Sequence, residues 1–317
     1  MTLAGLAYAF PESLPKHLAR PDIATGGKWS ATWIPAERKG LFAYAAASAD
    51  PKLYAVAIRG TNPSFTSGFL HNLLTNVTVD EADDWKQDPV GAGARIARGA
   101  KEAVDVLTTI TDAKGETLVA HLRRTVPDGA TVLVTGHSLG GCLASVLALY
   151  LARESAGRFR VKPITFAAPT AGDRGFAELY QVTFPDAERY FNHLDLVPRA
   201  WHGVGEFGEL YAAPGPRCPP DFRVFSRLAS DRVGRHAYTQ PGAGIPLGDE
   251  TVRYPGGGGL LARLGRLLRR KVFFLEALHH HMPDRYLENL GAPKLPFRLP
   301  LPWLYRNVTR RLKAILP

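Results

Sequence analysis

The sequence predicts an α/β fold in which a mostly parallel central sheet is covered by helices on both faces. Short apolar runs with strand character alternate along the chain with longer helical stretches, as in parallel sheets with helical crossovers. An apolar run at 131–135 leads through a glycine-flanked serine directly into a helical stretch of small residues. Finally, 45% of the 317 residues are apolar, which is enough to bury a sizeable core.

The expected elements follow one another without an internal repeat. Low complexity is confined to the glycine run at 256–259. The predicted strands are 41–46, 53–59, 131–135, 162–167 and 188–192. The predicted helices are 96–109, 116–126, 139–155 and 176–181.

The hexapeptide at 136–141 is the strongest chemical signal in the chain. It reads Gly-His-Ser-Leu-Gly-Gly and lies between a predicted strand and a predicted helix. In that context G-x-S-x-G indicates a nucleophile elbow, a strained turn that holds the serine hydroxyl clear of the backbone. Side chains at Gly136 or Gly140 would collide with such a turn. The alternative is an ordinary junction in which Ser138 only caps the helix.

Four segments in order resemble the class 3 lipases, the family typified by fungal triacylglycerol lipases. They are a strand ending in Arg-Gly-Thr (54–61), the elbow (131–141), a segment similar to the family's TFGAPRVGN turn (164–173) and one similar to its NxxDxVPR segment (192–199). Together they cover residues 50–215. The resemblance implies an α/β-hydrolase fold and a serine carboxylic-ester hydrolase that acts on lipid esters without a cofactor.

A serine hydroxyl needs a base, which is normally a histidine oriented by a carboxylate. In the α/β-hydrolase fold the chain order is serine, acid, histidine. Ser138 is the expected nucleophile and Asp195 the expected acid, because Asp195 follows a strand-like run and precedes a proline. The alternative is that Asp195 caps a turn. Asp173, Asp186 and Asp221 lack this placement.

The expected base lies among three consecutive histidines, His279, His280 and His281. The family has a loop histidine before a helix that carries a tyrosine, and the offset to Tyr286 favours His281. A shift of one residue favours His280, and His279 ranks third. A metal site is not expected here, because adjacent histidines cannot all face one ion and no matching cysteine or carboxylate cluster exists.

His236 also follows the expected acid, and it is an alternative base on chain order alone. It lies in a segment that resembles a strand, so it ranks below the three histidines. The oxyanion formed during ester hydrolysis needs backbone N–H donors. Leu139 directly follows the nucleophile, and the resemblance implies Thr61 as the second donor. The alternative for Thr61 is a plain turn.

Two features depart from the family pattern. Residues 96–100 read Ile-Ala-Arg-Gly-Ala where the family carries VHxGF, and Asp195 is further from the histidines than the family leads us to expect. The additional residues between Asp195 and the histidines include the glycine run and a basic amphipathic stretch at 260–275. This stretch is expected to be a lid or an interfacial anchor, or a helix packed on the domain.

These patterns predict one domain over residues 1–317, with its core at about 40–290. Lid-like insertions are expected at about 62–93 and 255–278, and a basic tail at 291–317. The net charge is +10, of which +9 lies from residue 255 onward, where twelve Lys or Arg face three Asp or Glu. Such a segment suits anionic lipid headgroups, and the alternative is a solvated tail with a structural role only. Nucleic acid is not an expected partner, because no recognised motif accompanies the charge.

The chain carries two cysteines, Cys142 and Cys218, too few for a disulfide framework. Its N-terminus lacks a basic n-region, and no apolar run reaches the roughly eighteen residues of a membrane span. We therefore expect a cytoplasmic protein, either free or in peripheral contact with a membrane, and the alternative is export by an unrecognised route. Two alternatives to a lipase or esterase remain. One is a phospholipase or lipid acyltransferase at anionic membranes, and the other is a non-catalytic lipid-binding relative.

Overall fold

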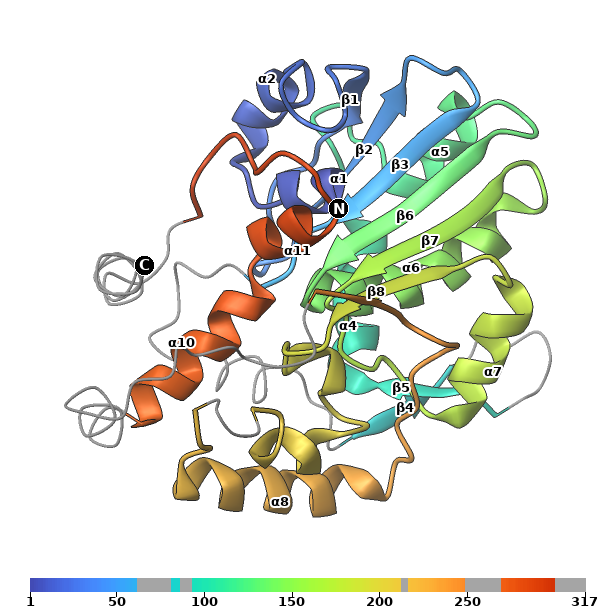
Figure 1. Ribbon diagram of the computed structural model, residues 1–317. Helices are drawn as coiled ribbons and strands as arrows, with labels where there is room; N and C mark the ends of the chain where they lie inside the picture. Colours follow the sequence, from blue (N-terminus) through green and yellow to red (C-terminus); the bar gives the residue numbers. More distant parts are fainter. Residues whose placement is uncertain (62–80, 86–92, 212–215, 249–268, 300–317) are drawn as a thin grey trace.

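The computed structural model describes residues 1–61, 81–85, 93–211, 216–248 and 269–299 (Figure 1). Within them, seven strands form one sheet in the order β1-β2-β3-β6-β7-β8-β9. The pairs β1–β2 and β2–β3 are antiparallel, and every pair from β3 to β9 is parallel. The strands are β1 (Trp29–Trp33), β2 (Ala43–Ser48), β3 (Leu53–Ile58), β6 (Thr131–His137), β7 (Arg160–Phe166), β8 (Glu188–Asn192) and β9 (Ile245–Leu247). A separate antiparallel pair is formed by β4 (Ala82–Asp84) and β5 (Arg95–Ala97).

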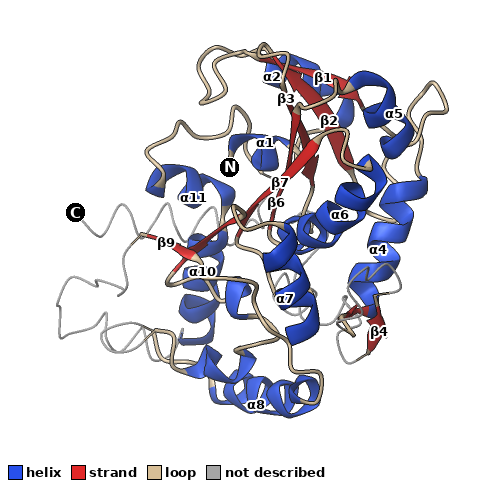
Figure 2. Cartoon of the chain, turned by 90° about the vertical axis from the view of Figure 1, so that its right-hand side faces the viewer, coloured by secondary structure: helices blue, strands red, loops and turns tan. Residues whose placement is uncertain are grey.

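Helices cover both faces of this sheet, which Figure 2 shows nearly edge-on. One face carries α4 (Arg98–Thr109), α5 (Leu118–Thr125), α6 (Leu139–Ser155) and α7 (Arg174–Thr183). The other carries α1 (Thr2–Leu6), α2 (Leu14–Leu18) and α11 (Pro283–Asn289). The remaining helices are α8 (Pro220–Gly234) and α10 (Arg269–His281), with 3-10 turns η1 (Pro11–Ser13), η3 (Val197–Arg199) and η4 (Val204–Gly208). The expected architecture, a mostly parallel sheet between two helical layers, is confirmed.

Alternation along the strands explains the two helical layers. On β2, Ala43 and Ala45 are buried against the α4–α7 layer, whereas Tyr44 points to the opposite face with α1 and α2. The Tyr44 hydroxyl donates a hydrogen bond of 2.8 Å to the carbonyl of Leu3 in α1. Successive side chains of a strand point to opposite faces, so a strand that is apolar on both faces requires cover on both.

The five predicted strands correspond to β2, β3, β6, β7 and β8, and the four predicted helices to α4–α7, with ends shifted by a few residues. Patterning did not identify α1, α2, β1, β4, β5, α8 or β9, and residues 96–97, predicted as helix, belong to β5. The buried core also extends further toward the N-terminus than the expected boundary near residue 40. Leu14 and Leu18 are fully buried in the same cluster as Leu287 and Leu295.

The expected insertions lie largely outside the described residues, namely at 62–80, 86–92 and 255–268, and so does the tail at 300–317. The described part of the second insertion is helix α10. Its Phe273 and Ala277 are buried in the core cluster of the α4–α7 layer. In the part of the chain that is described, no helix combines the length and apolarity needed to span a bilayer.

Candidate active site

Ser138 lies on the turn between β6 and α6, with backbone angles of φ 61° and ψ −133°. Positive φ is strained for a residue with a side chain, and the turn is held by its surroundings. The Ser138 N–H donates 3.0 Å to the carbonyl of Phe166 on β7. A Cβ at Gly136 would overlap the Gly140 carbonyl, and one at Gly140 would overlap the Ile58 carbonyl of β3. The glycines are therefore required by close packing around the turn, not only by the serine itself.

The structure brings Ser138, His281 and Asp195 into one hydrogen-bonded chain. The Ser138 Oγ lies 2.8 Å from His281 Nε2, and His281 Nδ1 lies 2.8 Å from Asp195 Oδ2. All three side chains are at most 2% exposed. Because a carboxylate only accepts hydrogen bonds, Nδ1 carries the ring proton and Nε2 is left to accept from the serine hydroxyl. Residues separated by 143 and 86 positions in the chain thus meet in a water-poor site.

Two further donors fix the Asp195 carboxylate. The Val197 N–H donates 2.9 Å to Oδ1, and the Tyr286 hydroxyl donates 2.8 Å to Oδ2. Tyr286 in turn accepts a hydrogen bond of 3.0 Å from the Asn192 N–H at the end of β8. Burial and the neighbouring Asp195 raise the pKa of Tyr286 well above its usual value, so the tyrosine remains a donor. The sequence marked Tyr286 as a point of resemblance but gave no contact for it.

The three consecutive histidines have three different environments. They form the end of α10, so the expectation of a loop histidine is wrong: the helix continues to His281. His280 Nε2 lies 3.0 Å from Glu276, and the His280 carbonyl accepts 2.7 Å from Asn192. Burial lowers the pKa of His279 to about 4. Successive residues of a helix project about 100° apart, so only one of the three can face Ser138.

His236 lies in the turn after α8, and its expected strand is therefore wrong. Leu139 and Thr61 are the two residues expected to bind the oxyanion. Leu139 is the first residue of α6, where a backbone N–H has no acceptor within the helix. Thr61 follows Gly60, and a Cβ at Gly60 would lie 3.1 Å from the Ser138 Cβ. The end of β3 therefore touches the elbow.

A second buried hydrogen-bonded chain passes behind the elbow. The Tyr8 hydroxyl donates 3.0 Å to His137 Nδ1, and His137 Nε2–H donates 2.8 Å to the His281 carbonyl. The Gly60 N–H also bonds to Tyr8. Burial and the nearby His281 hold the pKa of His137 well below its usual value, so its ring is neutral and Nδ1 accepts. This chain links the end of β3, the elbow and the end of α10. Sequence reasoning missed it, because no local pattern pairs Tyr8 with His137.

In the described part of the chain, no group of three or more His, Cys, Asp or Glu is arranged to hold a metal ion. Both cysteines are free and buried. Burial raises the pKa of the Cys142 thiol to about 12.

A family model and solved structures match parts or most of this chain. Residues 55–203 match the family model described as lipase (class 3), a range that includes Ser138 and Asp195 and ends before α10. The crystal structure of M37 lipase is similar with a TM-score of 0.73 and 22% identity, over 92% of this chain and 90% of that chain. A lipase from Rhizopus microsporus var. chinensis gives a TM-score of 0.48 and 22% identity, over 63% of this chain and 66% of its own. Residues 55–203, a little under half of the chain, thus match the class 3 lipase family, and the chain has the α/β-hydrolase fold of a carboxylic ester hydrolase.

Proposed function

We propose that the protein hydrolyses lipid esters through an acyl-enzyme formed on Ser138. The hydrogen-bonded chain from Ser138 through His281 to Asp195 supports this proposal most directly. As Oγ attacks the ester carbonyl, His281 Nε2 takes the hydroxyl proton, and Asp195 stabilises the resulting imidazolium. The N–H groups of Leu139 and Thr61 would donate to the oxyanion.

Collapse of the tetrahedral intermediate breaks the ester C–O bond, and His281 returns its proton to the leaving alcohol. Water then attacks the acyl-enzyme with the same imidazole as base. This step releases the carboxylic acid and restores the Ser138 hydroxyl. His280 is not assigned a proton-transfer role, because its ring bonds to Glu276 instead.

The test is a Ser138→Ala variant assayed with a series of p-nitrophenyl esters from short to long acyl chains. We expect kcat to fall by roughly 10⁴-fold or more, with the fold retained. Ser155→Ala is the matched control, because Ser155 is also a buried serine of α6 and only caps the helix end. A fluorophosphonate probe should label Ser138 in the parent protein, as peptide mass spectrometry would show. Parent-level hydrolysis by a folded Ser138→Ala variant would refute the proposal.

We also propose that the chain acts as a single domain and contacts anionic lipid through its basic region beyond residue 255. The site is formed by residues from the turn before α6, the loop after β8 and the end of α10, which supports one domain. The local excess of Lys and Arg supports the lipid contact. Sedimentation with vesicles of neutral or anionic lipid tests it. Binding that is independent of anionic lipid would argue against both this contact and a phospholipase or acyltransferase role.

A further inference from the structure

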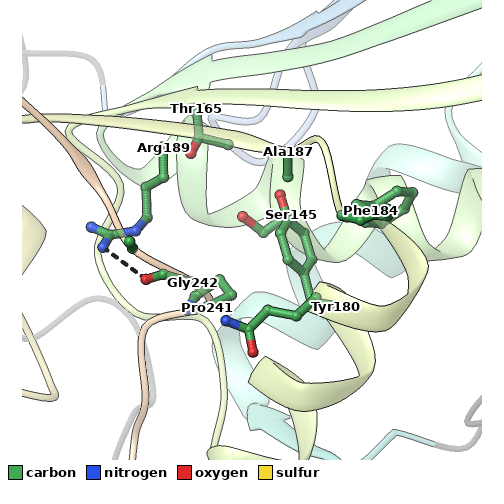
Figure 3. A pocket seen from close by; sticks show the side chains of 11 residues that line it. Ser145, Thr165, Tyr180, Phe184, Ala187, Arg189, Pro241 and Gly242 are labelled. Atoms are coloured by element: carbon green, nitrogen blue, oxygen red, sulfur yellow. Dashed lines mark hydrogen bonds between the residues drawn. The ribbon is translucent and has the colours of Figure 1, made fainter.

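A pocket of about 280 Å³ opens between α7, β8 and the segment 241–243 (Figure 3). Ser145 of α6 and Thr165 of β7 also line it. None of the residues proposed for catalysis is among its lining residues. The proposed catalytic mechanism therefore does not account for this pocket.

Arg189 is the charged residue of this pocket, and its guanidinium is poorly satisfied. Its Nη2 donates one long hydrogen bond of 3.5 Å to the Gly242 carbonyl, and its Nε is buried without a hydrogen-bond partner. The guanidinium carbon lies 5.5 Å from the centre of the Phe191 ring. In the described ranges no carboxylate forms an ion pair with it, whereas Arg160 and Arg174 each have one.

The groups that surround Arg189 electrostatically are neutral. Its field acts on Tyr180, Tyr286 and His202. Burial raises the pKa of both tyrosines and lowers that of His202, so each stays uncharged at neutral pH. Burial also lowers the pKa of Arg189 itself. A partly desolvated cation without a counter-charge is costly, and an anion placed beside it would recover that cost.

The remaining lining residues define what else a ligand must satisfy. Hydroxyl and amide groups come from Ser145, Thr165, Tyr180 and Gln181, and they can donate or accept without adding charge. Figure 3 shows Tyr180 and Ser145 across the hollow from Arg189. Apolar surface comes from Phe184, Pro185, Ala187, Pro241 and Ala243. A complementary ligand carries one negative charge and a short apolar body.

We propose that this pocket binds a small organic carboxylate, with its oxygens on Arg189 and its carbon chain against Phe184 and Pro241. The planar guanidinium matches a carboxylate in a bidentate manner. A single cation favours a monoanion over a phosphate dianion, which would require a second positive group. A cavity of this size lies at the small end of ligand sites and accepts only a few carbons. The acid released by ester hydrolysis is one source of such a ligand, and only that source rests on the proposed function.

Calorimetric titration with sodium hexanoate tests the binding, with hexanol and inorganic phosphate as comparison ligands. We expect saturable hexanoate binding that is roughly tenfold or more weaker in Arg189→Gln and unchanged in Arg160→Gln. Hexanol lacks the charge and phosphate lacks the apolar part, so both should bind more weakly than hexanoate. Equal hexanoate binding by Arg189→Gln, no binding by the parent, or tighter phosphate binding would overturn the proposal.

Stability measurements separate a ligand site from a structural arginine. Without ligand, Arg189→Gln should melt at or above the parent temperature, because the variant removes a desolvated charge. A strongly lowered melting temperature would assign Arg189 to the fold and overturn the proposal. Arg189→Lys keeps the charge but loses the planar guanidinium, so its affinity for hexanoate should lie between those of the parent and of Arg189→Gln. These readouts do not use ester hydrolysis, so their failure is distinguishable from failure of the Ser138 assignment.

Discussion

His279 should make the stability of the protein depend on pH. In the fold, burial lowers the pKa of His279 to about 4, and His280 and Arg285 act in the same direction. Glu276 and Glu288 oppose the shift without cancelling it. In an unfolded chain a histidine has a pKa of about 6.5. Between these values the unfolded state binds more protons, so the free energy of unfolding falls as the pH falls.

The size of this effect follows from the shift. A difference of roughly 2.5 pKa units corresponds to roughly 3 kcal/mol, and the partial solvent contact of the ring reduces it to about 2 kcal/mol. The stabilisation is fully present above about pH 6.5, is lost progressively through the window down to about pH 4, and changes no further below it. His121, His137 and His202 also have pKa values lowered by burial, so they add losses of the same sign.

Urea unfolding of the parent and His279→Gln, followed by tryptophan fluorescence from about pH 7 to about pH 4, isolates this contribution. The other histidines titrate in both proteins and cancel in the difference. We expect the parent to lose about 2 kcal/mol more than the variant across the window. Ester hydrolysis near pH 7 should be retained, because His281 and not His279 contacts Ser138. Identical pH dependence in the two proteins would refute the reasoning.

Three further predictions concern the site and its surroundings. Asp195→Asn should lower kcat by roughly 10⁴-fold in steady-state ester hydrolysis, since an amide cannot hold the required imidazole tautomer, and a loss below tenfold would contradict that role. Tyr8→Phe removes the donor to His137, so the free energy of unfolding should fall by about 1 to 3 kcal/mol in urea titrations. An unchanged value would show that this buried chain contributes no stability. Cys142 should resist a disulfide-exchange reagent near pH 8 until the protein unfolds, because its buried thiol has a pKa of about 12, and rapid labelling of the native protein would exclude this.

Local sequence patterns predicted the central part of the fold well, because its signals are short-range. The run 131–137 is a strand by its own composition, and the glycines at 136 and 140 are required by a turn only a few residues long. The N-terminal helices α1 and α2 have five residues each, too few for a helical period to stand out. Their burial comes from contacts with β2 and with residues near 287–295, which no local window contains.

Local sequence likewise predicted some residues of the candidate site and not others. Ser138 and Asp195 each lie in a distinctive local motif, whereas three adjacent histidines offer the same chemistry and differ only in direction. That direction is set by how far α10 continues, and the helix ends at His281. Arg189 offered no signal at all, because an arginine on a strand is ordinary until the structure shows that its Nε is buried without a hydrogen-bond partner.

Ser138 and His281 are 143 positions apart in the chain, so they leave the ribosome at different times. Protein synthesis proceeds from the N-terminus, and a domain generally folds as a unit. The elbow and its sheet neighbours β3 and β7 are synthesised well before α10 emerges from the ribosome. A nascent chain that ends before α10 therefore contains the Ser138 hydroxyl but not the His281 imidazole that lies 2.8 Å from it in the folded protein. On the proposed function, ester hydrolysis begins only once α10 has been synthesised and has docked beside Ser138.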